Sequence, residues 1–447
     1  MADDKQSRRG RRPRSCPDRV RALVVGGGGR EHALAWKISQ SPRLERLWVT
    51  HPENPALAEL GEPCPESTDP KQLWRLNNWL DREKIDLVVV GPEAPLAEGF
   101  ADAVATDHRL VFGPTRDGAR LESDKAWAKQ LMRSASIPTA ESRAFATYEQ
   151  AEEFLRSRED EPPVIKAAGL AAGKGVIVPD SLDEALDAID RIMRRKEFGA
   201  AGDRVVIEER LSGPEVSVLA LVDGRNIYVL EPCQDHKRLL EGGEGPNTGG
   251  MGAYCPTPIL SDDMLSEVER EILVPTVDAL RREEIDYRGV LYAGLMLTPS
   301  GPKVLEFNCR FGDPECQPLM MRLQGDFLHT LWCTASGRLT EADLSWDPRH
   351  ACCVVMASEG YPGPYAKGLE ITGITDAEAL GDLKVFHAGT KREDGRVVTS
   401  GGRVLGVTAL GETLQAARDL AMRGCEQIKF KGAQYRSDIG AQALAIR

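Results

Sequence analysis

The chain has 447 residues, of which 41% are hydrophobic and 28% charged, and its formal net charge at pH 7 is -12. This composition is typical of a globular protein, and the length indicates several domains because a single core stops growing beyond about 250 to 300 residues. No apolar run approaches the roughly 18 residues that a membrane-spanning helix needs, and an acidic chain binds nucleic acid poorly. We therefore expect no membrane and no nucleic acid among its partners.

The first 19 residues differ in charge from the rest of the chain. Residues 1–19 contain seven Lys or Arg and three Asp, a net charge of +4. The segment lacks the apolar core of a secretion signal and contains acidic residues. We predict a disordered basic tail over residues 1–19.

Ten cysteines are distributed along the chain. They form no C-x-x-C pair. This pattern favours reduced thiols in a cytoplasmic protein.

Strand and helix signals alternate over residues 20–122, which predicts a parallel α/β domain. Strand signals fall at 20–25, 46–50, 85–93 and 109–114. Four glycines, residues 26–29, join the first strand to the first helix, and the free N–H groups at a helix N-terminus favour an anion there. A dinucleotide site is the alternative, but Glu31 stands where the G-x-G-x-x-G pattern requires Gly or Ala.

The stretch VIKAAGLAAGKGVIV, residues 164–178, places glycines and two lysines between two runs of β-branched residues. It is not a P-loop, because only three residues separate Gly169 from Gly173 and the chain continues as a strand. A glycine-rich hairpin with a lysine at its tip can fold over phosphates, since glycines let backbone N–H groups approach an anion. These residues alone leave an ordinary flexible hairpin open as the alternative.

Residues 123–325 predict an α+β unit with mainly antiparallel strands. Helix signals fall at 123–140, 181–195 and 261–284, and strand signals at 204–211, 216–224, 289–297 and 302–310. In VLEFNCRFGDPE, strand alternation places Glu306, Asn308 and Arg310 on one face. Oxygen ligands beside a cation suit Mg²⁺ bound to phosphates, whereas a surface ion pair at a strand edge is the alternative.

Two further stretches complete the pattern. In VVIEERLSGPEVSV, acceptors at Glu208, Glu209 and Glu215 beside an apolar strand are suitable for a nucleobase and a ribose. Beyond about residue 326, strands at 350–358, 384–393 and 402–411 and a helix at 412–428 predict a β-rich terminal domain.

Ten motifs, taken together, resemble one known family from about residue 20 to 440. They are GGGGREHALAWK, DLVVVGPEAPL, FGPT, KAAGLAAGKGV, EERLSGPEVS, QDHKR, GPNTGGMGAYCP, YAGLM, EFNCRFGDPE and VFHAGTK. In this order they are similar to the motifs of glycinamide ribonucleotide synthetase, or phosphoribosylamine-glycine ligase, an ATP-grasp family of purine biosynthesis. The resemblance implies a Rossmann-like N-terminal α/β substrate-binding domain (20–122), a two-lobed ATP-grasp domain (123–325), a C-terminal β-rich domain (326–447) and a monomer.

The resemblance also implies the reaction. ATP phosphorylates the carboxylate of glycine, and the amine of 5-phosphoribosylamine then displaces phosphate to form glycinamide ribonucleotide. No protein nucleophile is required, so positioning and charge neutralisation carry the catalysis. Mg²⁺ or Mn²⁺ is the implied metal.

The site residues that the resemblance implies fall into four groups. Lys125 and Lys166 bind phosphate, with Lys166 also catalytic, and Gly173, Lys174 and Gly175 cover the triphosphate. Glu208, Leu211 and Glu215 bind adenosine, Leu211 through its backbone. Glu306 and Asn308 hold the metal, while the catalytic Arg310 and Asp313 face glycine and its acyl phosphate. Asp235, His236 and Lys237, following Gln234, face the second substrate, and Gly28, Gly29, Arg30, Glu31 and Glu93 complete the substrate residues.

The chain departs from the family pattern at three places. Ala168 stands where a polar residue is expected, HPENPAL (51–57) replaces a more glycine-rich loop, and the basic tail has no counterpart in the family. The strand VLYAGLML also supplies no carboxylate, although many other ATP-grasp enzymes place a third metal ligand on the neighbouring strand. Another ATP-grasp ligase, such as a carboxylase-type enzyme, is one alternative, but it would lack QDHKR and GPNTGGMGAY. A nucleotide-binding regulator without catalysis is the other, and the presence of Lys166, Glu306, Asn308 and Arg310 argues against it.

Overall fold

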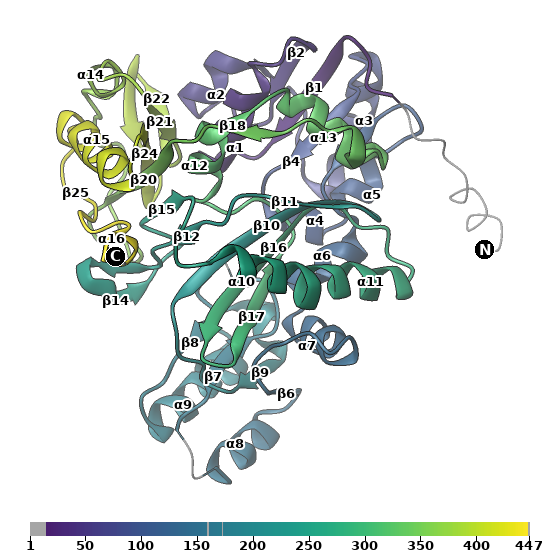
Figure 1. Ribbon diagram of the computed structural model, residues 1–447, viewed down its shortest axis with the longest axis vertical. Helices are drawn as coiled ribbons and strands as arrows, with labels where there is room; N and C mark the ends of the chain where they lie inside the picture. The colour runs from purple at the N-terminus through teal and green to yellow at the C-terminus, as the bar shows by residue number, and fades with distance from the viewer. Residues whose placement is uncertain (1–14, 159–160, 172, 446–447) are drawn as a thin grey trace.

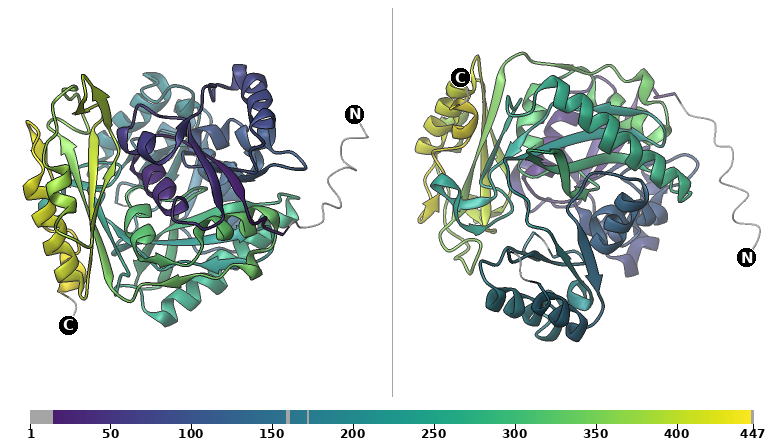
Figure 2. Two further views of the ribbon diagram at one scale, coloured as in Figure 1. Left: turned by 90° about the horizontal axis from the view of Figure 1, so that it is seen from above. Right: turned by 60° about the horizontal axis from the view of Figure 1, so that its bottom comes forward.

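The computed structural model describes residues 15–158, 161–171 and 173–445. Figure 1 shows the N-terminal domain at the top, the C-terminal domain at the side, and a lobe with α8 (Tyr148–Arg156) and α9 (Leu182–Ile189) projecting at the bottom. The right view of Figure 2 shows the same lobe set apart from the rest of the molecule. Within the described ranges, no helix has the length and apolar character needed to cross a membrane.

The N-terminal domain is a parallel five-stranded sheet in the order β3-β2-β1-β4-β5. Its strands are β1 (Val20–Val25), β2 (Leu44–Val49), β3 (Glu62–Pro63), β4 (Leu87–Val90) and β5 (Leu110–Phe112). Its helices are α1 (Gly29–Ile38), α2 (Pro55–Leu60), α3 (Leu73–Arg82), α4 (Glu93–Ala97), α5 (Phe100–Val104) and α6 (Arg116–Ser123), with a 3₁₀ turn at Pro70–Gln72. All four residues of β4 are buried, as expected for a parallel sheet covered on both faces.

The strand order places β2 and β4 on opposite sides of β1, so ligands are expected beyond the carboxyl ends of β1 and β4. The glycine loop follows β1, and Glu93 begins α4 just after β4. The Glu31 side chain fills the space between the two strand ends, where a Cβ on Gly26 or Gly91 would collide with it. This filled space differs from a dinucleotide fingerprint, which keeps a small residue at that position.

The first ATP-grasp lobe is an antiparallel sheet in the order β6-β9-β7-β8. The strands are β6 (Ser142–Phe145), β7 (Val164–Ala167), β8 (Val176–Ile177) and β9 (Val205–Glu208). Beside α8 and α9, the segment contains α7 (Lys125–Ser134), a π-helical turn at Asp190–Arg194 and a 3₁₀ turn at Gly199–Asp203. Asp124 caps the N-terminus of α7, and its carboxylate accepts a hydrogen bond from the backbone N–H of Trp127.

The second lobe is an antiparallel sheet in the order β11-β10-β16-β17. Its strands are β10 (Glu215–Asp223), β11 (Ile227–Val229), β16 (Arg288–Thr298) and β17 (Gly301–Asn308). The predicted helix at 261–284 consists of α10 (Asp262–Val268), a π-helical turn at Glu269–Leu273 and α11 (Val274–Arg282). The mainly antiparallel pairing predicted for this region is therefore confirmed.

The C-terminal sheet recruits two strands from the ATP-grasp region, which the sequence did not indicate. Its order is β12-β15-β20-β24-β21, and β25 also pairs with β20. The strands are β12 (Gln234–Asp235), β15 (Gly252–Cys255), β20 (His350–Ser358), β21 (Leu383–His387), β24 (Arg403–Gly411) and β25 (Ala433–Gln434). Because β15 pairs directly with β20, the QDHKR and GPNTGGMGAY motifs lie where the second lobe and the C-terminal domain meet.

The remaining elements connect and cover these sheets. Two hairpins are β13 (Arg238–Leu240) with β14 (Glu244–Asn247) and β22 (Thr390–Glu393) with β23 (Arg396–Thr399), and a further strand pair is β18 (Leu323–Gln324) with β19 (Ser345–Trp346). The helices are α12 (Cys316–Arg322), α13 (Phe327–Ser336), α14 (Ile374–Glu378), α15 (Leu414–Gln427) and α16 (Ala441–Leu444). Short 3₁₀ turns lie at Glu241–Gly243 and Leu339–Glu341. Helix α12 packs against α1 of the N-terminal domain and against β20 and β24. All ten cysteines are free.

Two expectations need correction. Residues 1–14 of the predicted tail lie outside the described residues, but residues 15–19 lie on the N-terminal domain: the carbonyl of Pro17 accepts a hydrogen bond from Arg43 at 3.2 Å, and Cys16 packs against the core. The single strand predicted at 384–393 is two strands, β21 and β22. The chain turns between them at Gly389, where a Cβ would collide with Gly401.

Candidate active site

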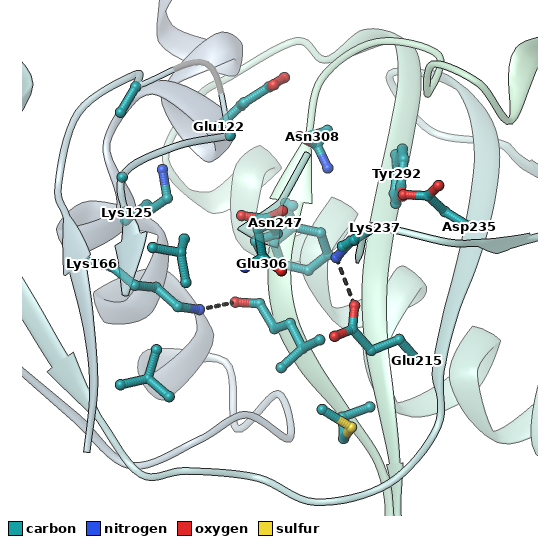
Figure 3. Close-up of a pocket in the computed structure, with 18 of the residues that line it drawn as sticks. Glu122, Lys125, Lys166, Glu215, Asp235, Lys237, Asn247, Tyr292, Glu306 and Asn308 are labelled. Carbon is teal, nitrogen blue, oxygen red and sulfur yellow. Dashed lines mark hydrogen bonds and ion pairs between the residues drawn. The ribbon is translucent and has the colours of Figure 1, made fainter. Parts of the chain in front are cut away.

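A cavity of about 700 Å³ lies between the two lobes and is bounded by the N-terminal and C-terminal domains. Figure 3 shows Lys125 and Lys166 on one side, with Glu306 and Asn308 across from them. The predicted site residues that line it are Arg30, Glu93, Lys125, Lys166, Gly173, Gly175, Glu208, Leu211, Glu215, Asp235, Lys237, Glu306, Asn308, Arg310 and Asp313. Residues as far apart in the chain as Arg30 and Arg403 thus meet at one site.

Two buried lysines share one carboxylate at the inner end of the cavity. Lys166 on β7 forms an ion pair with Glu208 on β9, and its ammonium also donates to the carbonyl of Leu305 at 3.1 Å. Lys129, one turn into α7, lies 2.7 Å from the other oxygen of Glu208. Burial lowers the pKa of Lys129, and the Glu208 carboxylate opposes that shift. Two positive charges are thereby held beside the cavity.

The end of β17 presents oxygen ligands to the cavity, and Arg310, two residues after the strand, presents a guanidinium. Arg310 donates to Asn308 Oδ1 at 3.1 Å, to Glu122 at 2.7 Å and to Glu93 at 3.2 Å. Burial alone raises the pKa of Glu306, but Lys237, Lys125 and other cations outweigh it, so the pKa is lowered and the carboxylate is ionised. Within the described part of the chain, the Glu306 side chain forms no ion pair and no hydrogen bond, so its oxygens are available to a ligand.

Charged groups also line the wall beside the second lobe. Lys237 lies 2.7 Å from the carboxylate of Glu215 (Figure 3). Burial lowers the pKa of Lys237, but Glu215 and Glu306 outweigh burial and the pKa is raised. Arg403 at the start of β24 donates to Asp313 Oδ2 at 3.0 Å and to the Asp313 carbonyl at 2.6 Å. Burial raises the pKa of Asp313, but Arg403, Arg30 and the hydrogen bond from Gln317 together outweigh burial, and the pKa is lowered.

Five predicted site residues do not line the cavity: Gly28, Gly29, Glu31, Lys174 and His236. The carboxylate of Glu31 caps its own helix, accepting from the Gly28 N–H at 2.6 Å and from Arg30 at 2.6 Å. His236 Nε2 accepts from the Gly440 N–H at 3.0 Å. His236 follows β12 directly, and this bond directs its ring to the C-terminal segment. Lys174 is exposed.

Four residues at the cavity were missed from the sequence: Glu122, Lys129, Glu315 and Arg403. Lys129 shares a helix face with Lys125 at i,i+4 spacing, which was a usable signal. Glu122 binds the Cys309 N–H at 2.8 Å in addition to Arg310, a contact across 187 residues that no local pattern indicates. Ala168, which stands where a polar residue is expected, is buried and does not line the cavity. The carbonyl of Ala168 accepts a hydrogen bond from the Lys125 N–H at 2.8 Å.

A cavity between two antiparallel lobes, with lysines on one and oxygen ligands on the other, defines an ATP-grasp ligase. Residues 20–122, 123–316 and 351–442 match the N domain, the ATP-grasp (A) domain and the C domain of phosphoribosylglycinamide synthetase. The chain belongs to the phosphoribosylglycinamide synthetase family. The resemblance seen in the motifs is therefore confirmed, and the carboxylase-type alternative is not supported.

Individual relatives agree with the family assignment. The chain is 52% identical over 429 residues to a phosphoribosylamine-glycine ligase of Rhodopirellula baltica, covering 94% of this chain and 97% of that protein. It is 49% identical over 433 residues to the human trifunctional purine biosynthetic protein adenosine-3, covering 96% of this chain and 42% of that longer protein. The crystal structure of phosphoribosylamine-glycine ligase from Thermotoga maritima superposes with a TM-score of 0.82 at 33% identity, covering 94% of this chain and all of that one.

Proposed function

We propose that the chain joins glycine to 5-phosphoribosylamine at the expense of ATP, giving glycinamide ribonucleotide, ADP and phosphate. The observation that carries this proposal is one cavity in which Lys125 and Lys166 face Glu306 and Asn308 (Figure 3). The names of the full-length relatives support the same reaction. A monomeric state and a cytoplasmic location remain predictions.

The part of the cavity proposed to bind ATP has an apolar wall for adenine and cations for the phosphates. Val164, Val206, Leu211 and Met296 line the cavity and offer an apolar surface for adenine. The ammonium groups of Lys125 and Lys166 would bind the phosphates by charge-assisted hydrogen bonds. Glu208 holds Lys166 in place before ATP binds, and the phosphates then compete with it for the lysine.

The donor set on β17 fits a small divalent cation. Glu306 supplies an ionised carboxylate and Asn308 an amide oxygen, the hard ligands that Mg²⁺ and Mn²⁺ prefer. Across β16, Gly294 and Tyr292 stand opposite Glu306 and Asn308 and supply no carboxylate. Phosphate oxygens and water would complete the coordination. When bound, the cation would neutralise charge on the phosphates.

The chain's own residues orient the two chemical steps. In the first, the terminal phosphoryl group moves from ATP to a carboxylate oxygen of glycine. In the second, the amine nitrogen of phosphoribosylamine bonds to the carbonyl carbon, the bond to phosphate breaks, and the amine loses a proton. Arg310, fixed by Glu93 and Glu122, would stabilise negative charge on the transferred group.

An assay of ADP release tests the proposal. With glycine and freshly generated phosphoribosylamine, the wild-type chain should release ADP, and omission of either substrate should abolish sustained turnover. Glu306→Gln should fold normally and lose most turnover, with partial recovery at raised metal concentration, because the amide keeps the shape but not the charge. ADP release that is independent of glycine, or wild-type turnover by the variant at limiting Mg²⁺, would contradict the proposal.

A further inference from the structure

Glu208 lies between two ammonium groups that belong to different elements. Lys166 on β7 pairs with one carboxylate oxygen of Glu208, and the ammonium of Lys129 on α7 lies 2.7 Å from the other. All three residues are buried. Over the described ranges of the chain, Glu208 has no third basic partner, and Lys129 pairs with no other carboxylate. Two cations therefore share one carboxylate.

The second contact of each lysine lies on a different side of the cavity wall. The ammonium of Lys166 donates to the carbonyl of Leu305 at 3.1 Å, and Leu305 lines the cavity. The ammonium of Lys129 donates to the hydroxyl group of Thr139 at 2.7 Å, which in turn donates to the Val304 carbonyl at 2.6 Å. Thr139 and Val304 lie outside the described lining of the cavity. Lys129 is thus held from behind the wall, whereas the Lys166 side chain points into the cavity (Figure 3).

Binding of a triphosphate would change the charge balance around Glu208. An ammonium of Lys166 that turns to a phosphate no longer neutralises this carboxylate. A buried carboxylate without a cation is costly, and beside a triphosphate it would also repel the ligand. Burial lowers the pKa of Lys129, Glu208 raises it, and the charge of Lys166 lowers it again. Departure of Lys166 would therefore strengthen the pair between Lys129 and Glu208.

We propose that Lys129 is a positioning residue that keeps Glu208 neutralised and thereby frees Lys166 for the phosphates of ATP. This inference rests on the proposed function and adds a residue that acts through Glu208 rather than by touching the nucleotide. Without Lys129, Glu208 would have Lys166 as its remaining partner and would retain it in competition with the phosphates. ATP would then bind more weakly, and its phosphoryl group would lack the lysine during transfer.

A double-mutant cycle on Lys129 and Glu208 tests this role. Lys129→Met keeps the length of the side chain and removes its charge, and it should weaken binding of a non-hydrolysable ATP analogue roughly tenfold or more in calorimetry. Adding Glu208→Gln removes the carboxylate that retains Lys166. The double variant should therefore bind the analogue more tightly than Lys129→Met and within about threefold of Glu208→Gln alone.

Two further variants complete the design. Arg133→Met, at an exposed position one turn further along α7, is the matched control and should bind the analogue as wild type does. Lys129→Gln keeps a donor for Thr139 and should show the same rescue by Glu208→Gln, even if Lys129→Met does not fold. Melting temperatures of all variants show whether weaker binding follows loss of the fold.

A different role for Lys129 would give a different cycle. If Lys129 only packs, the two substitutions should add, and the double variant should bind the analogue no better than the single Lys129 variant. If Lys129 contacts ATP directly, its replacement should weaken binding equally in the wild-type and Glu208→Gln backgrounds. Either result would overturn the inference.

The outcomes also separate this inference from the proposed function. If wild type releases ADP only with glycine and phosphoribosylamine, but the Lys129 variants bind the analogue normally, the positioning role is wrong while the function stands. If analogue binding follows the predicted cycle but no ligation occurs, the role of Lys129 holds and the proposed function fails. Absence of analogue binding by wild type would overturn both.

Discussion

Arg403 connects the C-terminal domain to the cavity through a single side chain. Its guanidinium donates to the Asp313 carbonyl and carboxylate and also to the Gly249 carbonyl. The planar fork of arginine can hold these acceptors at once, whereas the single ammonium of lysine cannot reproduce that geometry. Arg403 therefore positions both Asp313 and the Thr248–Gly250 turn that lines the cavity.

Replacement of Arg403 by lysine or alanine should distinguish the effect of its charge from the effect of its guanidinium geometry. We expect Arg403→Lys to lower kcat/KM roughly tenfold, and Arg403→Ala to lower it further, because Asp313 then lacks a charged partner (about 1.5 to 3 kcal/mol for such a contact). Steady-state kinetics with each substrate varied in turn, beside the Tm, are the measurement. Arg418→Lys on α15 is the control. Wild-type kinetics for Arg403→Lys would show that only its charge matters.

At the scale of elements, the loop between β7 and β8 begins at a residue that is fixed by an ion pair and has an exposed tip. Lys166 is held within β7 by Glu208, whereas Lys174 is exposed. Gly173 has a φ of +74°, and a Cβ there would meet no atom within 4 Å, whereas a Cβ on Gly175 would lie 2.6 Å from Ala171. We expect the tip to close over the triphosphate and Lys166 to bind ATP before and after closure.

This difference predicts two kinetic phenotypes. Lys174→Ala should lower kcat more than it weakens ATP binding, whereas Lys166→Ala should impair both, each by tens to a hundredfold, since a charge-assisted contact contributes roughly 1.5 to 3 kcal/mol. A non-hydrolysable ATP analogue should also slow protease cleavage within residues 169–175. If cleavage is unaffected by nucleotide and Lys174→Ala is kinetically silent, the loop is only a surface hairpin.

At the scale of the whole molecule, two histidines meet where the N-terminal and C-terminal domains join. His32 Nδ1 accepts a hydrogen bond from the His387 N–H at 2.8 Å. Asn54, the N-cap residue of α2, donates to the carbonyls of Gly27 and His387, both at 2.9 Å. Burial lowers the pKa of both imidazoles, that of His387 to about 4. Both rings are therefore neutral in the folded protein at pH 7.

Stability should consequently fall as the pH falls below neutrality. Because the folded pKa of His387 lies below the ordinary value of about 6.5, the unfolded chain binds its proton first, and stability present above about pH 6.5 is lost as the pH falls to about 4. The loss from this one group is on the order of 3 kcal/mol. Urea unfolding midpoints at pH 7, 6 and 5 measure it, and His387→Gln should flatten the trend relative to His108→Gln, an exposed control. Equal slopes for the two variants would contradict this prediction.

Much of the fold could be read from local patterns. Alternating strands and helices predicted the parallel N-terminal sheet, and the two-residue period of VLEFNCR predicted that Glu306, Asn308 and Arg310 face together, as the cavity shows. These features follow from local backbone geometry and side-chain burial, which neighbouring residues determine. The ten motifs identified the family because they preserve the spacing of residues as well as the residue types.

Only the tertiary structure decided which distant groups pair. Glu208 meets Lys129 and Lys166 rather than solvent, Arg403 reaches Asp313 across 90 residues, and β15 joins a sheet whose next strand begins at His350. His236, inside a matching motif, follows β12 and does not line the cavity, and its ring instead contacts the C-terminal segment at Gly440. Such pairings depend on long-range packing and on charge neutralisation in a buried setting, which have no local period and so leave no pattern in the sequence.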